Sequence, residues 1–172
     1  GCNKDDLNTF EEPEVNSNLR SFSNVYESDS ISPFLLEMYK KLDYMNDSIS
    51  FASSFESDFG LPAWDEMLIY DAQSHIITIT PVIDSISQEV KAIFYGTAMN
   101  GSSLFKIVEK GSLISELSED NYASQSKRNE ALTSVFYLNL FENNLYCTQD
   151  SLLAPYISEY ETKLDVELRF QL

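Results

Sequence analysis

Histidine and glycine are scarce in this sequence, and their scarcity excludes several classes of site. His75 is the single histidine, so metal sites and proton relays that need several imidazoles are excluded. The sequence contains no Gly-x-Gly-x-x-Gly motif, no P-loop and no Gly-x-Ser-x-Gly turn that would support a Ser-His-Asp triad. His75 is expected in an exposed turn beside Ser74. The sequence therefore predicts no catalytic residue, no metal ligand and no cofactor.

Basic residues are also few, and no apolar run is long enough to span a bilayer. Lysine and arginine total 11 against 28 acids, which gives a net charge of -17. Such a charge repels nucleic acid and anionic lipid surfaces, and the basic doublets Lys40-Lys41 and Lys127-Arg128 do not offset it. Nucleic acid is therefore excluded as a partner, and the acidity is typical of a solvated surface.

Only two cysteines are present, and they do not form a disulfide framework. Cys2 lies in a polar N-terminal segment, whereas Cys147 follows Leu145 and Tyr146. We expect Cys147 to be an unpaired, small, buried apolar residue, because no basic neighbour is available to activate its thiol.

Hydrophobic residues make up 43% of the 172 residues, enough for the core of one domain. Residues 1–31 are expected to lie outside that domain. This segment is rich in Asp, Glu, Asn and Ser, and it has too few apolar residues to offset the entropy of ordering it. The sequence thus predicts a flexible acidic tether over 1–31 and a single domain over 32–172.

The tether begins with Gly1-Cys2-Asn3-Lys4-Asp5-Asp6. Glycine before cysteine resembles the end of a bacterial lipobox, although a glycine left by protease cleavage of an expression tag is an alternative. Cys-x-Lys-Asp-Asp resembles the export signal of Bacteroidetes surface lipoproteins. The resemblance implies a lipid on Cys2, which anchors the chain in the outer membrane, at the cell surface or, as second choice, on the periplasmic side.

Two helices are predicted at the start of the domain. Ser32-Pro33 is a helix start signal, and apolar residues then recur at three- and four-residue spacing through Met45. A second helix is expected from Ser48, with Ile49, Ala52, Phe55 and Phe59 facing inward. Gly60 suits the residue after its end, and Pro62 prevents its continuation.

From Trp64 the apolar residues alternate, which predicts strands over 64–70, 76–82, 89–98 and 104–108. Asn100-Gly101 is typical of a tight hairpin turn. Residues 119–132 look helical, and residues 135–141 are compatible with a buried helix or a strand. Alternation from Leu164 to Leu172 predicts a final strand, either closing the sheet or belonging to a chain that continues beyond Leu172.

The predicted fold class is α+β, with an N-terminal helical pair packed on one face of a twisted antiparallel sheet. Cystatin-like and NTF2-like outlines are the two candidates. The segment from Gly60 to Trp64, followed by 79–82 and 92–96, resembles a module of uncharacterised Bacteroidetes surface proteins. That resemblance supports a folded module and implies no reaction.

Carboxylates are plentiful, so paired acids for glycoside hydrolysis are not excluded by composition. The acidic run Glu116, Glu119, Asp120 and Asn121 lacks the spacing of a calcium loop and is better explained as a helix N-terminus. The tyrosines could stack on sugars if several shared an exposed face, but most occupy apolar periodic positions and are expected in the core.

Four triplets share the order aspartate, serine, then isoleucine or leucine, at 29–31, 47–49, 84–86 and 150–152. They resemble the sequon of Bacteroidetes O-glycosylation systems. The resemblance makes four serines candidate glycosylation sites: Ser30, Ser48, Ser85 and Ser151. A structural explanation is also open, because Asp-Ser turns often precede helices and strands.

These patterns indicate a lipid-anchored cell-envelope protein that acts as a non-enzymatic binding or accessory module. Its partners would be outer-membrane lipid through Cys2 and an extracellular glycan or peptide. One alternative is the N-terminal domain of a larger surface enzyme. Another is a propeptide-like or inhibitor module that holds a partner strand at a sheet edge.

Overall fold

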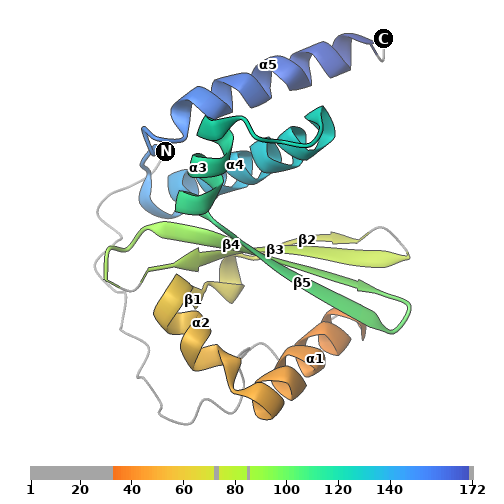
Figure 1. The fold of residues 1–172 in the computed structure, drawn as a ribbon. Helices are drawn as coiled ribbons and strands as arrows, with labels where there is room; N and C mark the ends of the chain where they lie inside the picture. The colour runs from red at the N-terminus through yellow and green to blue at the C-terminus, as the bar shows by residue number, and fades with distance from the viewer. Residues whose placement is uncertain (1–32, 72–73, 85, 171–172) are drawn as a thin grey trace.

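The computed structural model describes residues 33–71, 74–84 and 86–170, and it shows a sheet between two layers of helices (Figure 1). Helices α1 (Pro33–Ile49) and α2 (Phe51–Phe59) lie below the sheet in this view. Helices α3 (Lys110–Glu119), α4 (Gln125–Tyr146) and α5 (Ala154–Phe170) lie above it. The predicted α+β class, with a helical pair before the sheet, is confirmed.

The helical pair begins and ends near the predicted residues. Pro33 opens α1, and Leu35, Met38, Tyr39 and Leu42 bury the face that packs on the sheet. Ser50, with a φ of 50°, separates α2 from α1. Ile49 was predicted to face inward but is 68% exposed, because α1 extends through it and turns it to solvent.

The sheet is antiparallel throughout and centres on two long strands, β3 (His75–Ile83) and β4 (Val90–Met99). Strand β5 (Ser102–Glu109) pairs with β4. The short strands β1 (Leu61–Pro62) and β2 (Leu68–Asp71) both pair with β3, one beyond the other along the same edge.

The predicted strand over 64–70 is correct only in its second half. Residues Trp64–Glu66 form a single 3-10 turn, closed by the Met67 N–H donating to the Trp64 carbonyl at 3.3 Å. This turn lets the Trp64 ring pack edge-on against Tyr39 and Phe94 in the lower core. Packing of the partly buried indole against these two rings therefore overrides the local alternation.

The hairpin between β4 and β5 is confirmed. Asn100 and Gly101 have φ values of 48° and 79°, as a two-residue turn of the primed type requires. The Met99–Ser102 pair flanks the turn and sets the register of the whole ladder, through Ala92 opposite Glu109.

Both faces of the sheet are covered, although only one was expected to be. Phe94, Ala98 and Val82 face α1 and α2, while Ile79, Ile93 and Val90 face α3 and α4. Alternate residues of β3 and β4 are buried on opposite sides, so these strands are apolar along most of their length.

The stretch predicted as helical from 119 to 132 is divided by a turn. Asp120 ends α3 in a left-handed conformation, and Ser124 caps α4, where its hydroxyl accepts the Lys127 N–H at 3.3 Å. The ambiguous residues 135–141 lie within α4, and Val135, Leu138 and Phe141 are buried along one side of it.

The final strand predicted from Leu164 is wrong, because these residues continue α5 to Phe170; residues 171–172 lie outside the description. The helix starts much earlier, where the Leu153 carbonyl accepts the N–H groups of Tyr156 and Ile157. Leu153, Tyr156, Ile157 and Tyr160 contact the upper core at helical spacing. This packing propagates the helix through an alternating segment that would otherwise favour a strand.

The prediction for Cys147 is also wrong. The residue is exposed and ends α4 in a left-handed conformation, with a φ of 53°, and its N–H donates to the Asn143 carbonyl. Its sulfur is disulfide-bonded and not part of the apolar core. The predicted tether over 1–31, including Cys2, lies outside the described residues.

Candidate functional site

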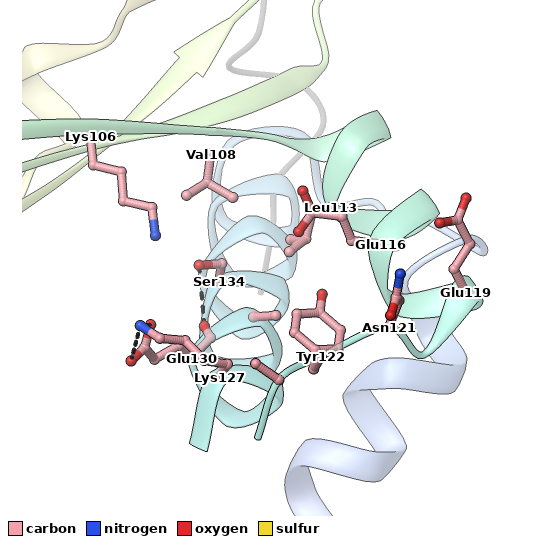
Figure 2. Close-up of a pocket in the computed structure, with 12 residues that line it drawn as sticks. Lys106, Val108, Leu113, Glu116, Glu119, Asn121, Tyr122, Lys127, Glu130 and Ser134 are labelled. Atoms are coloured by element: carbon pink, nitrogen blue, oxygen red, sulfur yellow. Dashed lines mark hydrogen bonds and ion pairs between the residues drawn. The ribbon is translucent and has the colours of Figure 1, made fainter. Parts of the chain in front are cut away.

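A cavity of about 390 Å³ lies between the sheet and the upper helices, and it is the candidate site (Figure 2). Its lining comes from three places in the sequence: β5, the α3 helix with the turn that follows it, and the first half of α4. The lining residues are Lys106, Val108, Leu113, Glu116, Glu119, Asn121, Tyr122, Ala123, Lys127, Glu130, Ala131 and Ser134.

One wall of the cavity is fixed by the direct passage of β5 into α3. The Glu109 carboxylate caps α3, accepting the Gly111 N–H at 3.0 Å, and the N–H and hydroxyl of Ser112 at 2.6 and 2.7 Å. Burial by itself raises the pKa of Glu109, but these hydrogen bonds outweigh it and leave the pKa below its ordinary value. The cap turns α3 back across the sheet.

Arg128 lies outside the lining and holds the elements around the cavity together. Its guanidinium donates twice to the Glu159 carboxylate of α5, with both distances at 2.9 Å. It also donates to the Leu117 carbonyl at 3.3 Å and to the Asp120 carboxylate at 2.8 Å. Arg128 thereby ties the end of α3, the turn and α5 to one point on α4.

Five polar side chains of the lining have no hydrogen-bond or ion-pair partner among the described residues: Lys106, Glu116, Glu119, Asn121 and Tyr122. The Tyr122 oxygen is buried, and burial, then the nearby Glu116 carboxylate, raises its pKa. Figure 2 shows the Lys106 side chain extending from β5 toward the cavity. A buried hydroxyl without a partner is costly, and a ligand would reach this oxygen only after a neighbouring side chain moved.

Three polar side chains of the lining, Lys127, Glu130 and Ser134, are bonded to the protein itself. Lys127 forms an ion pair with Glu130 at 3.0 Å. The Ser134 hydroxyl lies 3.0 Å from the Tyr95 hydroxyl and 3.4 Å from the Glu130 carbonyl. Ser134 is therefore not bonded to an imidazole or a carboxylate that could activate it as a nucleophile.

The acidic run was interpreted wrongly as a helix N-terminus. Glu116 and Glu119 lie in the last turns of α3, and Asp120 is its C-terminal cap, where the helix dipole does not favour negative charge. Arg128 offsets the charge of Asp120, while Glu116, Glu119 and Asn121 line the cavity. Their clustering was visible in the sequence, but the facing residue Lys106 was not.

His75 opens β3 opposite Met99, and its ring is half-buried rather than in an exposed turn. Its Nδ1 atom lies 3.3 Å from the Ser74 hydroxyl. The residue does not line the cavity. In the part of the chain that the structure describes, no three His, Cys, Asp or Glu side chains are grouped to hold a metal ion.

The candidate glycosylation sites fall in different surroundings. Ser48 is exposed at the end of α1, where its hydroxyl donates to the Tyr44 carbonyl at 2.8 Å, and Ser151 is exposed before α5. Ser30 and Ser85 lie outside the described residues. The aspartates Asp84 and Asp150 accept N–H groups two residues later, at 2.8 and 2.9 Å, which is the turn that the structural explanation requires.

The tyrosines do not form one exposed platform within the described residues. Tyr44 and Tyr70 are 66% and 48% exposed, and they lie in different layers, on α1 and β2. Tyr39 is fully buried, and burial raises its pKa to about 12. Core packing therefore accounts for most of them, as predicted.

Comparison with protein families, with curated proteins and with solved structures gives no match. The chemistry of the site must therefore be argued from its own residues. None of the helices in the described ranges is long and apolar enough to cross a membrane.

The Arg128–Glu159 pair predicts a specific acid sensitivity. The hydrogen bond from Arg128 holds the pKa of Glu159 at about 2, below its ordinary 4.5. Its stabilising effect is complete above pH 4.5 and is lost as the pH falls toward 2. In urea unfolding, Glu159→Gln should be less stable than the parent at pH 6, and the difference should shrink as the pH approaches 2.

The matched control is Glu130→Gln, which removes the exposed pair with Lys127 and should change stability by less than about 0.5 kcal/mol. A stability difference between Glu159→Gln and the parent that stays constant from pH 6 to the acid limit would contradict the prediction.

Proposed function

We propose that this chain is a lipid-anchored cell-envelope protein whose domain is a non-enzymatic binding module, with an extracellular glycan or peptide as its ligand. The observation that carries the proposal is the cavity, whose lining includes the Lys106 ammonium and the Glu116 and Glu119 carboxylates, none of which has a partner among the described residues. Pockets with a few such polar groups on a rigid scaffold are typical of binding sites.

The anchor is supported by the sequence around Cys2 and by its resemblance to Bacteroidetes export signals. Outer-membrane lipid would hold Cys2, and the acidic segment after it would separate the domain from the membrane. The placement at the cell surface, with the periplasmic side as second choice, belongs to this proposal. Nucleic acid does not suit a chain with a net charge of -17.

The alternative of a larger surface enzyme remains a second proposal for the whole protein. It would require catalytic groups beyond those that the cavity brings together. Within the cavity, the Ser134 hydroxyl is bonded to Tyr95 and to a backbone carbonyl, so no nucleophile and base are paired. This arrangement favours binding over catalysis.

The anchor is tested by the mass of the N-terminal peptide from membranes of the native host. We expect Cys2 to carry a thioether-linked diacylglycerol. The mass of the lipid would identify this modification directly. A Cys2 without lipid in the membrane fraction would overturn the anchor and leave the binding module to be judged separately.

The cavity is tested by nuclear magnetic resonance titration of the full chain with panels of oligosaccharides and of unstructured peptides. We expect at least one panel to shift the amide signals of Glu116, Tyr122 and Ser134. Ala123→Trp should fill the cavity and abolish the shifts, whereas Ser126→Trp, on an exposed position outside the lining, should not. Shifts that persist in Ala123→Trp, or no shift with either panel, would contradict a binding role for the cavity.

A further inference from the structure

Strand β5 leaves one of its edges unpaired. It pairs with β4 along its whole length, from Ser102 to Glu109, and with no other strand in the described part of the chain. No backbone hydrogen bond joins residues 102–109 to a described helix or loop. An open strand edge of this kind is a template for pairing with another extended chain.

The hairpin turn determines which backbone groups of β5 point outward. In a two-residue hairpin the flanking residues, Met99 and Ser102, form a hydrogen-bonded pair, and hydrogen-bonded and non-bonded pairs then alternate. Ser103, Phe105 and Ile107 therefore direct their N–H and carbonyl groups away from β4. These three residues offer regularly spaced donors and acceptors to an added strand.

The cavity adjoins this edge. Leu104, Lys106 and Val108 alternate with the outward-bonding residues, so their side chains lie on the side of the sheet that faces α4. Lys106 and Val108 line the cavity, and Figure 2 shows both side chains extending from β5 toward it. Leu104, two residues before Lys106, is 72% exposed. If a strand were added to β5, every second side chain of that strand would lie on the same face as Leu104, Lys106 and Val108. One of these side chains would contact Leu104, and the next ones would enter the cavity beside Lys106 and Val108.

The charges around the cavity determine which kind of peptide would bind as an added strand. Glu130 and Lys127 neutralise each other, which leaves the two carboxylates of Glu116 and Glu119 against the one ammonium of Lys106, so the lining keeps a net negative charge. The chain as a whole carries -17. A second copy of this chain would be repelled by its own charge, whereas a basic segment would be attracted.

We infer that β5 accepts an extended basic peptide segment as an additional strand, with a lysine or arginine side chain of that segment directed to Glu116 and Glu119 in the cavity. The inference rests on the proposed binding function and names its ligand as a peptide. Backbone hydrogen bonds to Ser103, Phe105 and Ile107 supply the affinity, and the cavity supplies the preference for a cation.

The probe is an eight-residue peptide of alternating threonine and lysine, which matches the length of β5. We expect it to bind the full chain and to slow hydrogen exchange of residues 103, 105 and 107. Two control peptides separate pairing from simple attraction between charges. One has glutamate in place of lysine, and the other carries N-methyl groups on the pairing edge; both should bind at least about tenfold more weakly.

Matched variants test the protein side. Ser103→Pro removes one outward N–H on an edge strand that tolerates proline, whereas Ser103→Ala keeps it, and the Ser103 hydroxyl has no hydrogen-bond partner among the described residues. We expect Ser103→Pro to weaken peptide binding by about tenfold and Ser103→Ala to leave it unchanged. The double variant Glu116→Gln with Glu119→Gln should weaken binding and reduce its dependence on salt.

Equal binding of the N-methylated and parent peptides, or equal binding by the Ser103 variants, would overturn strand addition. Absence of binding by the threonine–lysine peptide would do the same. If the oligosaccharide panel still shifted the cavity signals, the proposed binding function would stand and only its assignment to a peptide would fail.

Discussion

Gly60→Ala is expected to lower the free energy of unfolding by about 4 kcal/mol, because the position is both strained and closed to a side chain. Gly60 has a φ of 106° and a ψ of -163°, a conformation that residues with a Cβ atom rarely adopt. A Cβ atom there would lie 2.2 Å from the Ile83 carbonyl oxygen. The backbone of α2 or β3 would have to move, and the pairing of Leu61 with Ile83 would be lost.

Gly101→Ala is the matched control for Gly60→Ala. Gly101 also has a positive φ, 79°, but its Cβ atom would meet nothing closer than the Glu37 carboxylate at 3.9 Å. The cost should be about 1 kcal/mol, from backbone strain alone. Chemical denaturation of both variants measures the difference, and equal losses would show that the predicted clash with Ile83 is relieved at little cost.

Phe94→Ala should also destabilise the protein by about 4 kcal/mol, the usual cost of emptying a buried aromatic position. The Phe94 ring stacks on Phe105 at 5.7 Å and packs edge-on against Phe55 and Trp64 at 5.6 and 5.9 Å. These contacts join β4 to β5, to α2 and to the turn before β2. Removing the ring therefore leaves a cavity that touches four elements.

Leu104→Ala is the control for Phe94→Ala, since it removes an apolar group from a surface position that is 72% exposed. Its effect on stability should stay within about 0.5 kcal/mol. Urea unfolding and near-ultraviolet circular dichroism report both variants. A loss below about 2 kcal/mol for Phe94→Ala would mean that the neighbouring rings collapse into the space.

Local signals predicted the sheet and the helical pair well. The turn at Asn100-Gly101, the alternation in β3 and β4, and the start at Pro33 each depend on residues close in sequence. The predictions fail where packing between segments that are distant in sequence determines the secondary structure. Trp64 leaves the strand pattern to reach Tyr39 and Phe94, and the last helix is propagated from Leu153, Tyr156 and Tyr160.

The cavity was not predictable from the sequence, for a similar reason. Its acids and the Lys127-Arg128 doublet form local clusters in the sequence, but Lys106 reaches the same cavity from a separate strand, β5. Arg128 joins the elements around the cavity through Asp120 and Glu159, which lie on either side of it in the sequence. Only the folded chain shows which charges are neutralised and which remain.

The absence of any residue between β5 and α3 has a mechanical consequence. Because Glu109 belongs to the strand and also caps the helix, a displacement of one should carry the other with it. A peptide strand that pairs with β5 and straightens it would then move α3, which carries Glu116. A ligand bound against α3 in the cavity would in turn make β5 more rigid. Binding at the β5 edge and binding in the cavity would be thermodynamically linked, so that a ligand at either site would change the affinity of the other site by the same factor.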